Sequence, residues 1–223
     1  MTGRARALVL GSLCLAAAGP AGAGDRAVVV GIDSYPGVVL PRALTSAADD
    51  AQRMRRHLVD DRGFAPDAVT LLTNAEATSG AIIDALLGEL VDETAPGDRA
   101  FFYFAGLGGR IAADDGRETD AREEVLLAHG DGDPFAPIPE SALAEIFDRI
   151  GDREVSLVID ASMTAPGAGV LRPGDGVAAR AAAFGRLPPA ASRGAATFTE
   201  SAFGTGAAAR TVWVATAPSQ IAW

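Results

Sequence analysis

Short runs of aliphatic, β-branched and aromatic residues alternate along the chain with stretches in which apolar residues recur every three or four positions. The short runs are typical of strands buried on both faces, and they cover residues 26–32, 68–72, 100–104, 125–128, 155–159 and 211–215. The periodic stretches predict amphipathic helices, with apolar stripes at Ala47, Ala51, Met54 and Leu58, at Ile82, Ile83, Leu86 and Leu90, and at Leu143, Ile146, Phe147 and Ile150. This alternation predicts an α/β fold with a mostly parallel sheet, right-handed crossovers and helices on its faces.

The first 23 residues have the layout of a secretory signal peptide. Arg4 and Arg6 precede an uncharged apolar run over residues 7–18, and small residues end the segment at Ala23. The run is too short to span a membrane, which needs about 20 apolar residues. We expect cleavage after Ala23, a domain over residues 24–223 that is secreted or periplasmic, and no membrane attachment after cleavage. Cys14, the only cysteine, lies in this segment, so disulfides and thiol chemistry are excluded from the mature domain.

The acidic net charge of the chain limits the classes of molecule that it can bind. The chain has 19 basic residues, all arginine, against 29 acidic ones, and a formal net charge of -10. Such an acidic body repels nucleic acid and anionic lipid, so we expect no nucleic-acid partner. Residues 165–210 are rich in Ala, Gly, Pro and Ser with little periodicity, which predicts a long mobile loop before the last strand.

Two segments that directly follow predicted strands are placed where ligands bind in such folds. Residues 105–109 follow Phe101-Phe102-Tyr103-Phe104, and residues 160–164 follow the run that ends at Ile159. Because the carboxyl ends of parallel strands meet at one edge of a sheet, we expect these two loops to lie together there.

Four segments, in order, carry a resemblance to a known family. They read RAVVVGIDSYPG followed by ALTSAADDAQRM, then VTLLTNAEAT, then APGDRAFFYFAGLGGR, then LVIDASMTAPGAG. From residue 26 to residue 223 the chain resembles the caspase-like peptidases, in particular metacaspases and their bacterial relatives. The resemblance implies a caspase-like three-layer sandwich, with a mostly parallel six-stranded sheet flanked by helices.

The resemblance also identifies the positions of the family's catalytic pair. The family's histidine falls on Leu107 and its cysteine falls on Ser162. The chemistry needs a thiolate nucleophile and an imidazole that exchanges protons, and leucine supplies neither. Gly106, Gly108 and Gly109 are retained around Leu107. We therefore expect a pseudopeptidase that keeps the loop without its catalyst.

One specificity element of the family is present. Asp160 stands two residues before Ser162, where metacaspase-like members carry the acid that receives a basic side chain, and Asp33 supplies a second carboxylate after the first strand. The implied partner is a polypeptide that presents an arginine or lysine side chain. The alternative is that Asp160 accepts backbone hydrogen bonds at a turn.

Two other functions stay open at this point. Ser162 could serve as the nucleophile of a serine hydrolase, with His129 or an aspartate as its base, although the Gly-x-Ser-x-Gly turn is absent; His57 is expected to be a solvated residue of the first helix. Alternatively, Leu107 fills the old cleft and the chain is a structural or regulatory module.

The acidic loop at residues 114–120 raises the question of a calcium site. Its spacing does not match an EF-hand loop. The other ligand positions of calcium-binding relatives carry only Glu140 at a helix entry and, approximately, Gly169. We therefore expect a solvated acidic loop, no metal ion and no cofactor.

Overall fold

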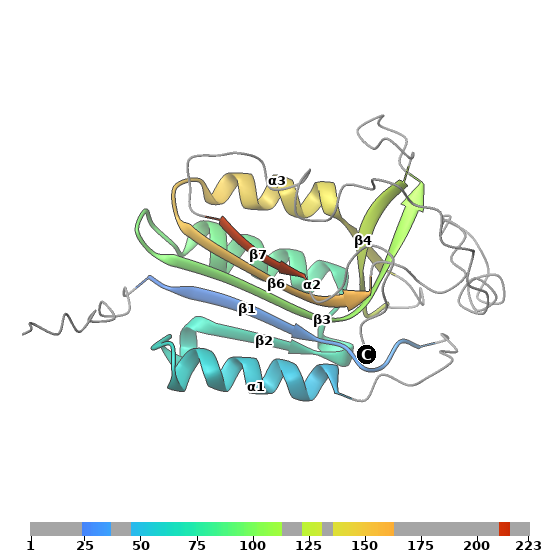
Figure 1. Ribbon diagram of the computed structural model, residues 1–223, viewed down its shortest axis with the longest axis horizontal. Coiled ribbons are helices and arrows are strands. Elements are labelled where there is room, and N and C mark those ends of the chain that lie inside the picture. Colours follow the sequence, from blue (N-terminus) through green and yellow to red (C-terminus); the bar gives the residue numbers. More distant parts are fainter. Residues whose placement is uncertain (1–23, 37–45, 113–121, 131–135, 163–209, 215–223) are drawn as a thin grey trace, which may run out of the picture.

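The computed structural model describes residues 24–36, 46–112, 122–130, 136–162 and 210–214 (Figure 1). The predicted signal peptide (1–23), the acidic loop (114–120) and the predicted mobile loop (165–210), apart from Arg210, lie outside these residues. The helices among the described residues are all too short or too polar to cross a membrane.

Five strands run parallel in the centre of the sheet. Their order is β2-β1-β3-β6-β7, with bounds Val69–Thr73 for β2, Arg26–Gly31 for β1, Arg99–Ala112 for β3, Glu154–Ser162 for β6 and Arg210–Val214 for β7. Each corresponds to one of the apolar runs in the sequence. The α/β fold with a mostly parallel sheet is therefore confirmed.

The sheet is mixed rather than purely parallel. β3 is 14 residues long, and beyond its parallel part it pairs antiparallel with β4 (Arg122–Ala128), which in turn pairs antiparallel with β5 (Ala136–Pro139). β5 brings the described sheet to seven strands, one more than the sequence predicted. Its sequence, Ala-Pro-Ile-Pro, has little of a strand's signature, because proline cannot donate to a ladder.

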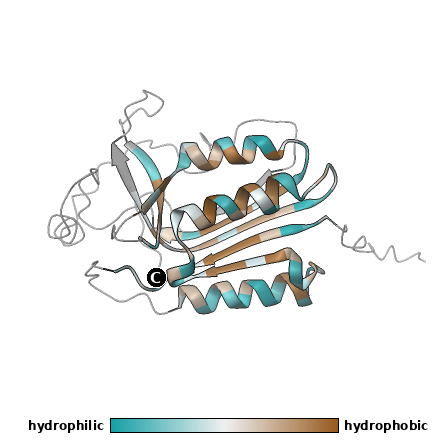
Figure 2. Cartoon of the chain, turned by 180° about the vertical axis from the view of Figure 1, so that it is seen from behind, coloured by the Kyte–Doolittle hydropathy of each residue, from teal (hydrophilic) through white to brown (hydrophobic). Residues whose placement is uncertain are grey.

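The helices lie in two layers, one on each side of the sheet (Figures 1 and 2). α1 (Ala47–Asp60) covers one face. α2 (Ser79–Ala85), which continues as the π-helix η3 (Leu86–Asp92), and α3 (Glu140–Ile150) cover the other. Single 3-10 turns, η1 (Pro66–Ala68) and η2 (Asn74–Glu76), flank β2. The three-layer arrangement agrees with the caspase-like expectation.

Alternation along the strands divides the core into two clusters. Successive strand residues point to opposite faces, so Val28 and Val30 join the larger cluster under α2 and α3, whereas Ala27 and Val29 join the smaller cluster under α1. The central strands are accordingly the most hydrophobic elements in Figure 2, while α1 is largely hydrophilic on its outer side.

A buried ion pair between Asp25 and Arg99 connects the amino ends of β1 and β3. Asp25, only 3% exposed, accepts the backbone N–H of Arg99 at 2.7 Å with Oδ1 and two guanidinium N–H groups, at 2.9 and 2.7 Å, with Oδ2. The guanidinium also stacks over the ring of Phe64, 4.5 Å from its centroid. These contacts join the start of β1, the start of β3 and the segment after α1.

Candidate functional site

The two segments expected to share one edge of the sheet are direct neighbours. In the parallel register of β3 and β6, Ala105 pairs with Asp160, and Leu107 pairs with Ser162. Residues 105–109 and residues 160–162, where the sequence suggested loops, continue the strands β3 and β6. The two positions predicted for the family's catalytic pair therefore lie side by side on adjacent strands.

Leu107 is held through its backbone and packs with its side chain. Its N–H donates to the hydroxyl of Tyr35 at 2.8 Å, and its half-buried side chain contacts the larger core cluster. Burial raises the pKa of Tyr35 well above its ordinary value, against the lowering effect of the bond to Leu107 and with a smaller raising effect of the Asp33 charge. The phenol is therefore neutral and accepts the amide proton.

The three glycines predicted to shape a loop around Leu107 are residues of β3. A Cβ on Gly106 would lie 2.5 Å from the Tyr35 hydroxyl and 3.2 Å from the Phe104 ring, so only glycine allows this approach. Gly108 and Gly109 are buried residues of β3 that pair with β4.

Asp33 supports α1. Its two carboxylate oxygens accept the N–H groups of Ala47 and Ala48 at 2.7 and 3.1 Å, which satisfies free donors of the first turn and places a negative charge at the positive end of the helix. Asn74 fixes the approach to α1 by accepting the N–H groups of Asp33 and Ser34 at 2.9 and 3.1 Å. Substrate binding by Asp33 stays a prediction, and any ligand would meet a carboxylate already occupied by backbone donors.

Asp160 lies half-buried on the α1 face of the sheet. The charge of a second carboxylate, Asp50, which the sequence did not single out, acts on it. Burial raises the pKa of Asp160, and the negative charge of Asp50, in the first turn of α1, raises it further. The pKa of Tyr103 is raised by burial and then by these same two carboxylates. We call Asp50 and Asp160 the acidic pair. Two half-buried carboxylates whose charges disfavour each other form a site that a cation would stabilise.

The sequence did not identify Asp50 as a site residue, because an acid at this position is already explained by the start of a helix. It belongs to the Ala-Asp-Asp-Ala start of a helix, where acids are favoured by the helix dipole. Its carboxylate also receives Arg53 Nη1 at 2.6 Å, with the Asp50 side chain 31% and the Arg53 side chain 64% exposed. The only available signal was its position inside the segment ALTSAADDAQRM that carries the family resemblance.

The two histidines occupy different parts of the structure. His57 is exposed near the end of α1, with Nδ1 2.8 Å from Asp61 Oδ2. His129 is half-buried just after β4. Its backbone N–H donates to the carbonyl of Ala77 at 2.9 Å, and the residue forms an isolated β-bridge with Thr78. The solvated role expected for His57 agrees with this exposure, and a base role for His129 stays a prediction.

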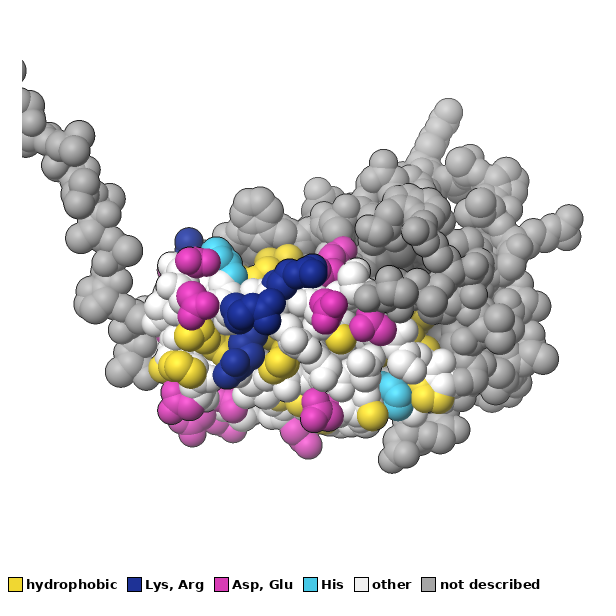
Figure 3. Space-filling model, turned by 90° about the horizontal axis from the view of Figure 1, so that it is seen from below, with side chains coloured by type: hydrophobic (Ala, Val, Ile, Leu, Met, Phe, Trp, Pro, Cys, Tyr) yellow, Lys and Arg dark blue, Asp and Glu magenta, His cyan; other side chains and the backbone are white. Residues whose placement is uncertain are grey.

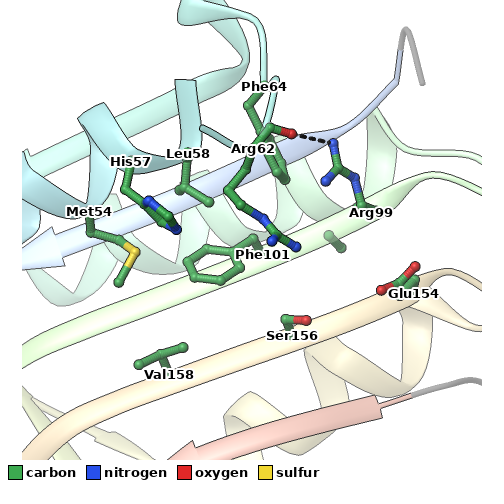
Figure 4. Close-up of a pocket in the computed structure, with 11 residues that line it drawn as sticks. Met54, His57, Leu58, Arg62, Phe64, Arg99, Phe101, Glu154, Ser156 and Val158 are labelled. Atoms are coloured by element: carbon green, nitrogen blue, oxygen red, sulfur yellow. Dashed lines mark hydrogen bonds between the residues drawn. The ribbon is translucent and has the colours of Figure 1, made fainter. Parts of the chain in front are cut away.

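A separate open groove of about 370 Å³ runs along α1 on the same face of the sheet (Figure 4). Its floor includes Phe101 and Val158, and Arg99 and Glu154, the first residues of β3 and β6, line one end. The groove therefore runs from the amino ends of the strands to Met54 and Val158. Met54 lies one turn after Asp50 on α1, and Val158 lies two residues before Asp160 on β6, so this end of the groove adjoins the acidic pair.

Comparison with known proteins extends the likeness over most of the described chain. A model of the metacaspase, peptidase C14 domain matches residues 25–165. Metacaspase-7 of Arabidopsis thaliana is 28% identical over 140 residues, which are 60% of this chain and 33% of that protein. Metacaspase-4 of the same plant is 31% identical over 99 residues, 43% of this chain and 23% of that protein.

A fungal relative and a solved structure add to this. Metacaspase-1 of Cryptococcus neoformans var. neoformans serotype D is 29% identical over 89 residues, covering 38% of this chain and 20% of that protein. The matches thus span a third or less of these relatives. The crystal structure of protein GSU0716 from Geobacter sulfurreducens superposes with a TM-score of 0.50 at 23% identity, over 63% of this chain and 52% of that one, and supports the fold alone.

Proposed function

Because the family model covers well over half of its residues, the chain belongs to the metacaspase family of C14 peptidases, and we propose that it is a member that binds a basic segment of a polypeptide without cutting it. We further propose that it does so outside the cytoplasm, after removal of residues 1–23.

The loss of cleavage is supported by the identity of the paired residues at the strand ends. Leu107 and Ser162 are neighbours in the β3–β6 register, as a catalytic pair requires, yet leucine can neither accept nor donate a proton. Its side chain packs against the core, which leaves the site with a structural residue where a base is needed.

The observation that carries the binding proposal is the acidic pair. Asp160 is half-buried, and the negative charge of Asp50 raises its pKa. Among the described residues it has no ion-pair partner. The planar guanidinium of an arginine, or the ammonium of a lysine, would offset both charges and donate hydrogen bonds to the carboxylates. Since deprotonated Asp160 is the form that attracts a cation, binding should strengthen as the pH rises through its raised pKa.

Fluorescence polarisation tests this proposal. A fluorescein-labelled Gly/Ala peptide with a single arginine should bind the full chain saturably, and the same peptide with citrulline in place of arginine should not. Asp160→Asn should weaken binding about tenfold or more, since a hydrogen-bonded charge is removed. Asp84→Asn, which removes an exposed acid of α2, is the matched control and should leave binding unchanged.

The same peptides distinguish the other two functions. Cleavage next to arginine that disappears in Ser162→Ala would establish a serine hydrolase instead. Equal absence of binding for the arginine and citrulline peptides, by a folded protein, would favour a module whose cleft is filled by Leu107.

A further inference from the structure

The acidic pair already holds one cation from the protein itself. Arg53 lies one helical turn after Asp50 on α1, and its Nη1 donates to Asp50 Oδ1 at 2.6 Å. The arginine is thus seated on the carboxylate whose charge acts on Asp160 and Tyr103. Figure 3, which views the molecule from the α1 side, shows arginine side chains running across this face between acidic ones.

The two carboxylates differ in how they are neutralised. Asp50 has Arg53 as its partner, whereas Asp160 has no ion pair within the described part of the chain. A basic side chain that binds at the acidic pair would meet a carboxylate without an ion-pair partner at Asp160 and a carboxylate already paired with Arg53 at Asp50.

We propose that Arg53 is a resident competitor at the acidic pair, which weakens the binding of an external arginine or lysine and selects ligands able to displace it from Asp50. This inference rests on the proposed function, because it concerns the same site.

The exposure of Arg53 makes such displacement feasible. Its side chain is 64% exposed, so the guanidinium can turn into solvent without leaving a buried gap. Exposed pairs within a helix are weak and sensitive to salt. A resident charge of this kind lowers affinity through repulsion of the incoming cation and through occupation of Oδ1, and both effects end when Arg53 loses its charge.

The test compares Arg53→Gln with Arg56→Gln in the polarisation assay. Both variants remove one exposed arginine from α1, but only Arg53 pairs with Asp50. Arg53→Gln should tighten binding of the arginine peptide about three- to tenfold at low ionic strength, and the gain should shrink in high salt. Arg56→Gln should change affinity less than twofold.

The outcomes separate this inference from the proposed function. If the wild-type chain binds the peptide through Asp160 but Arg53→Gln binds equally or more weakly, Arg53 is not a competitor and only the inference is overturned. If Arg53→Gln binds where the wild type does not, the inference is supported in its strongest form. If neither binds although circular dichroism shows both folded, the inference and the proposed function both fall.

Discussion

Replacing Tyr35 by phenylalanine tests how the chain is fixed at Leu107. The substitution keeps the buried ring, which is 5% exposed, and removes only the hydroxyl that accepts the Leu107 N–H at 2.8 Å. A partly buried amide that loses its partner costs about 1–2 kcal/mol. We expect a decrease of that size in the free energy of unfolding, with an unchanged urea m-value, because packing is retained.

Two measurements follow the effect of Tyr35→Phe. Urea unfolding monitored by circular dichroism gives the change in the free energy of global unfolding. Hydrogen exchange of the Leu107 amide gives the change in local protection at that hydrogen bond. Because the pKa of Tyr35 is raised, its phenol stays neutral at any pH below about 10, so the difference from wild type should be the same at pH 6 and pH 9.

Tyr103→Phe is the matched control. Tyr103 is also 5% exposed, but its hydroxyl makes no hydrogen bond among the described residues, so we expect a change within about 0.5 kcal/mol. The reasoning is refuted if Tyr35→Phe is as stable as the wild type, or if protection of the Leu107 amide is unaffected.

Three further substitutions have defined outcomes. Asp25→Asn breaks a buried ion pair and should cost about 2–4 kcal/mol in urea unfolding; a loss below about 1 kcal/mol would contradict the role of that pair. Asp160→Asn should raise the melting temperature at pH 7, because an acid whose pKa is raised by folding destabilises the folded state above that pKa. The gain should vanish near pH 3, below the ordinary aspartate pKa of about 4, where Asp160 is protonated in both states. A gain that does not depend on pH would contradict a raised pKa of Asp160. Gly106→Ala should lose about 1–3 kcal/mol through overpacking, whereas Gly80→Ala on α2, where a Cβ meets nothing within 4 Å, should be neutral or stabilising; equal effects of the two would show that Gly106 has room.

Strand positions and helix positions were readable because burial leaves a direct pattern in the sequence. A strand covered on both faces needs a continuous apolar run, as in residues 26–31, and a helix on a sheet needs an apolar stripe, as in α3. The direction of β4 was not readable, since an apolar run carries no information on which neighbour it pairs with. β5 was missed because Ala136–Pro139 has two prolines in four residues.

The candidate site was predictable only as far as single residues and local motifs allow. The adjacency of Leu107 and Ser162 followed from the rule that parallel strands end at one edge. Only Asp160 of the acidic pair was visible in the sequence, since the charge of Asp50 acts on Asp160 only because α1 packs on the sheet. The hydrogen bonds of Asp33 to Ala47 and Ala48 were hidden for the same reason, because they join residues 14 and 15 positions apart.

The most direct test of binding without cleavage is one incubation of the full chain with the single-arginine peptide, in which polarisation and peptide mass are measured together. We predict saturable binding that Asp160→Asn weakens, while the peptide keeps its intact mass. Peptide fragments that end at arginine, formed by the wild type and absent with Ser162→Ala, would contradict the account.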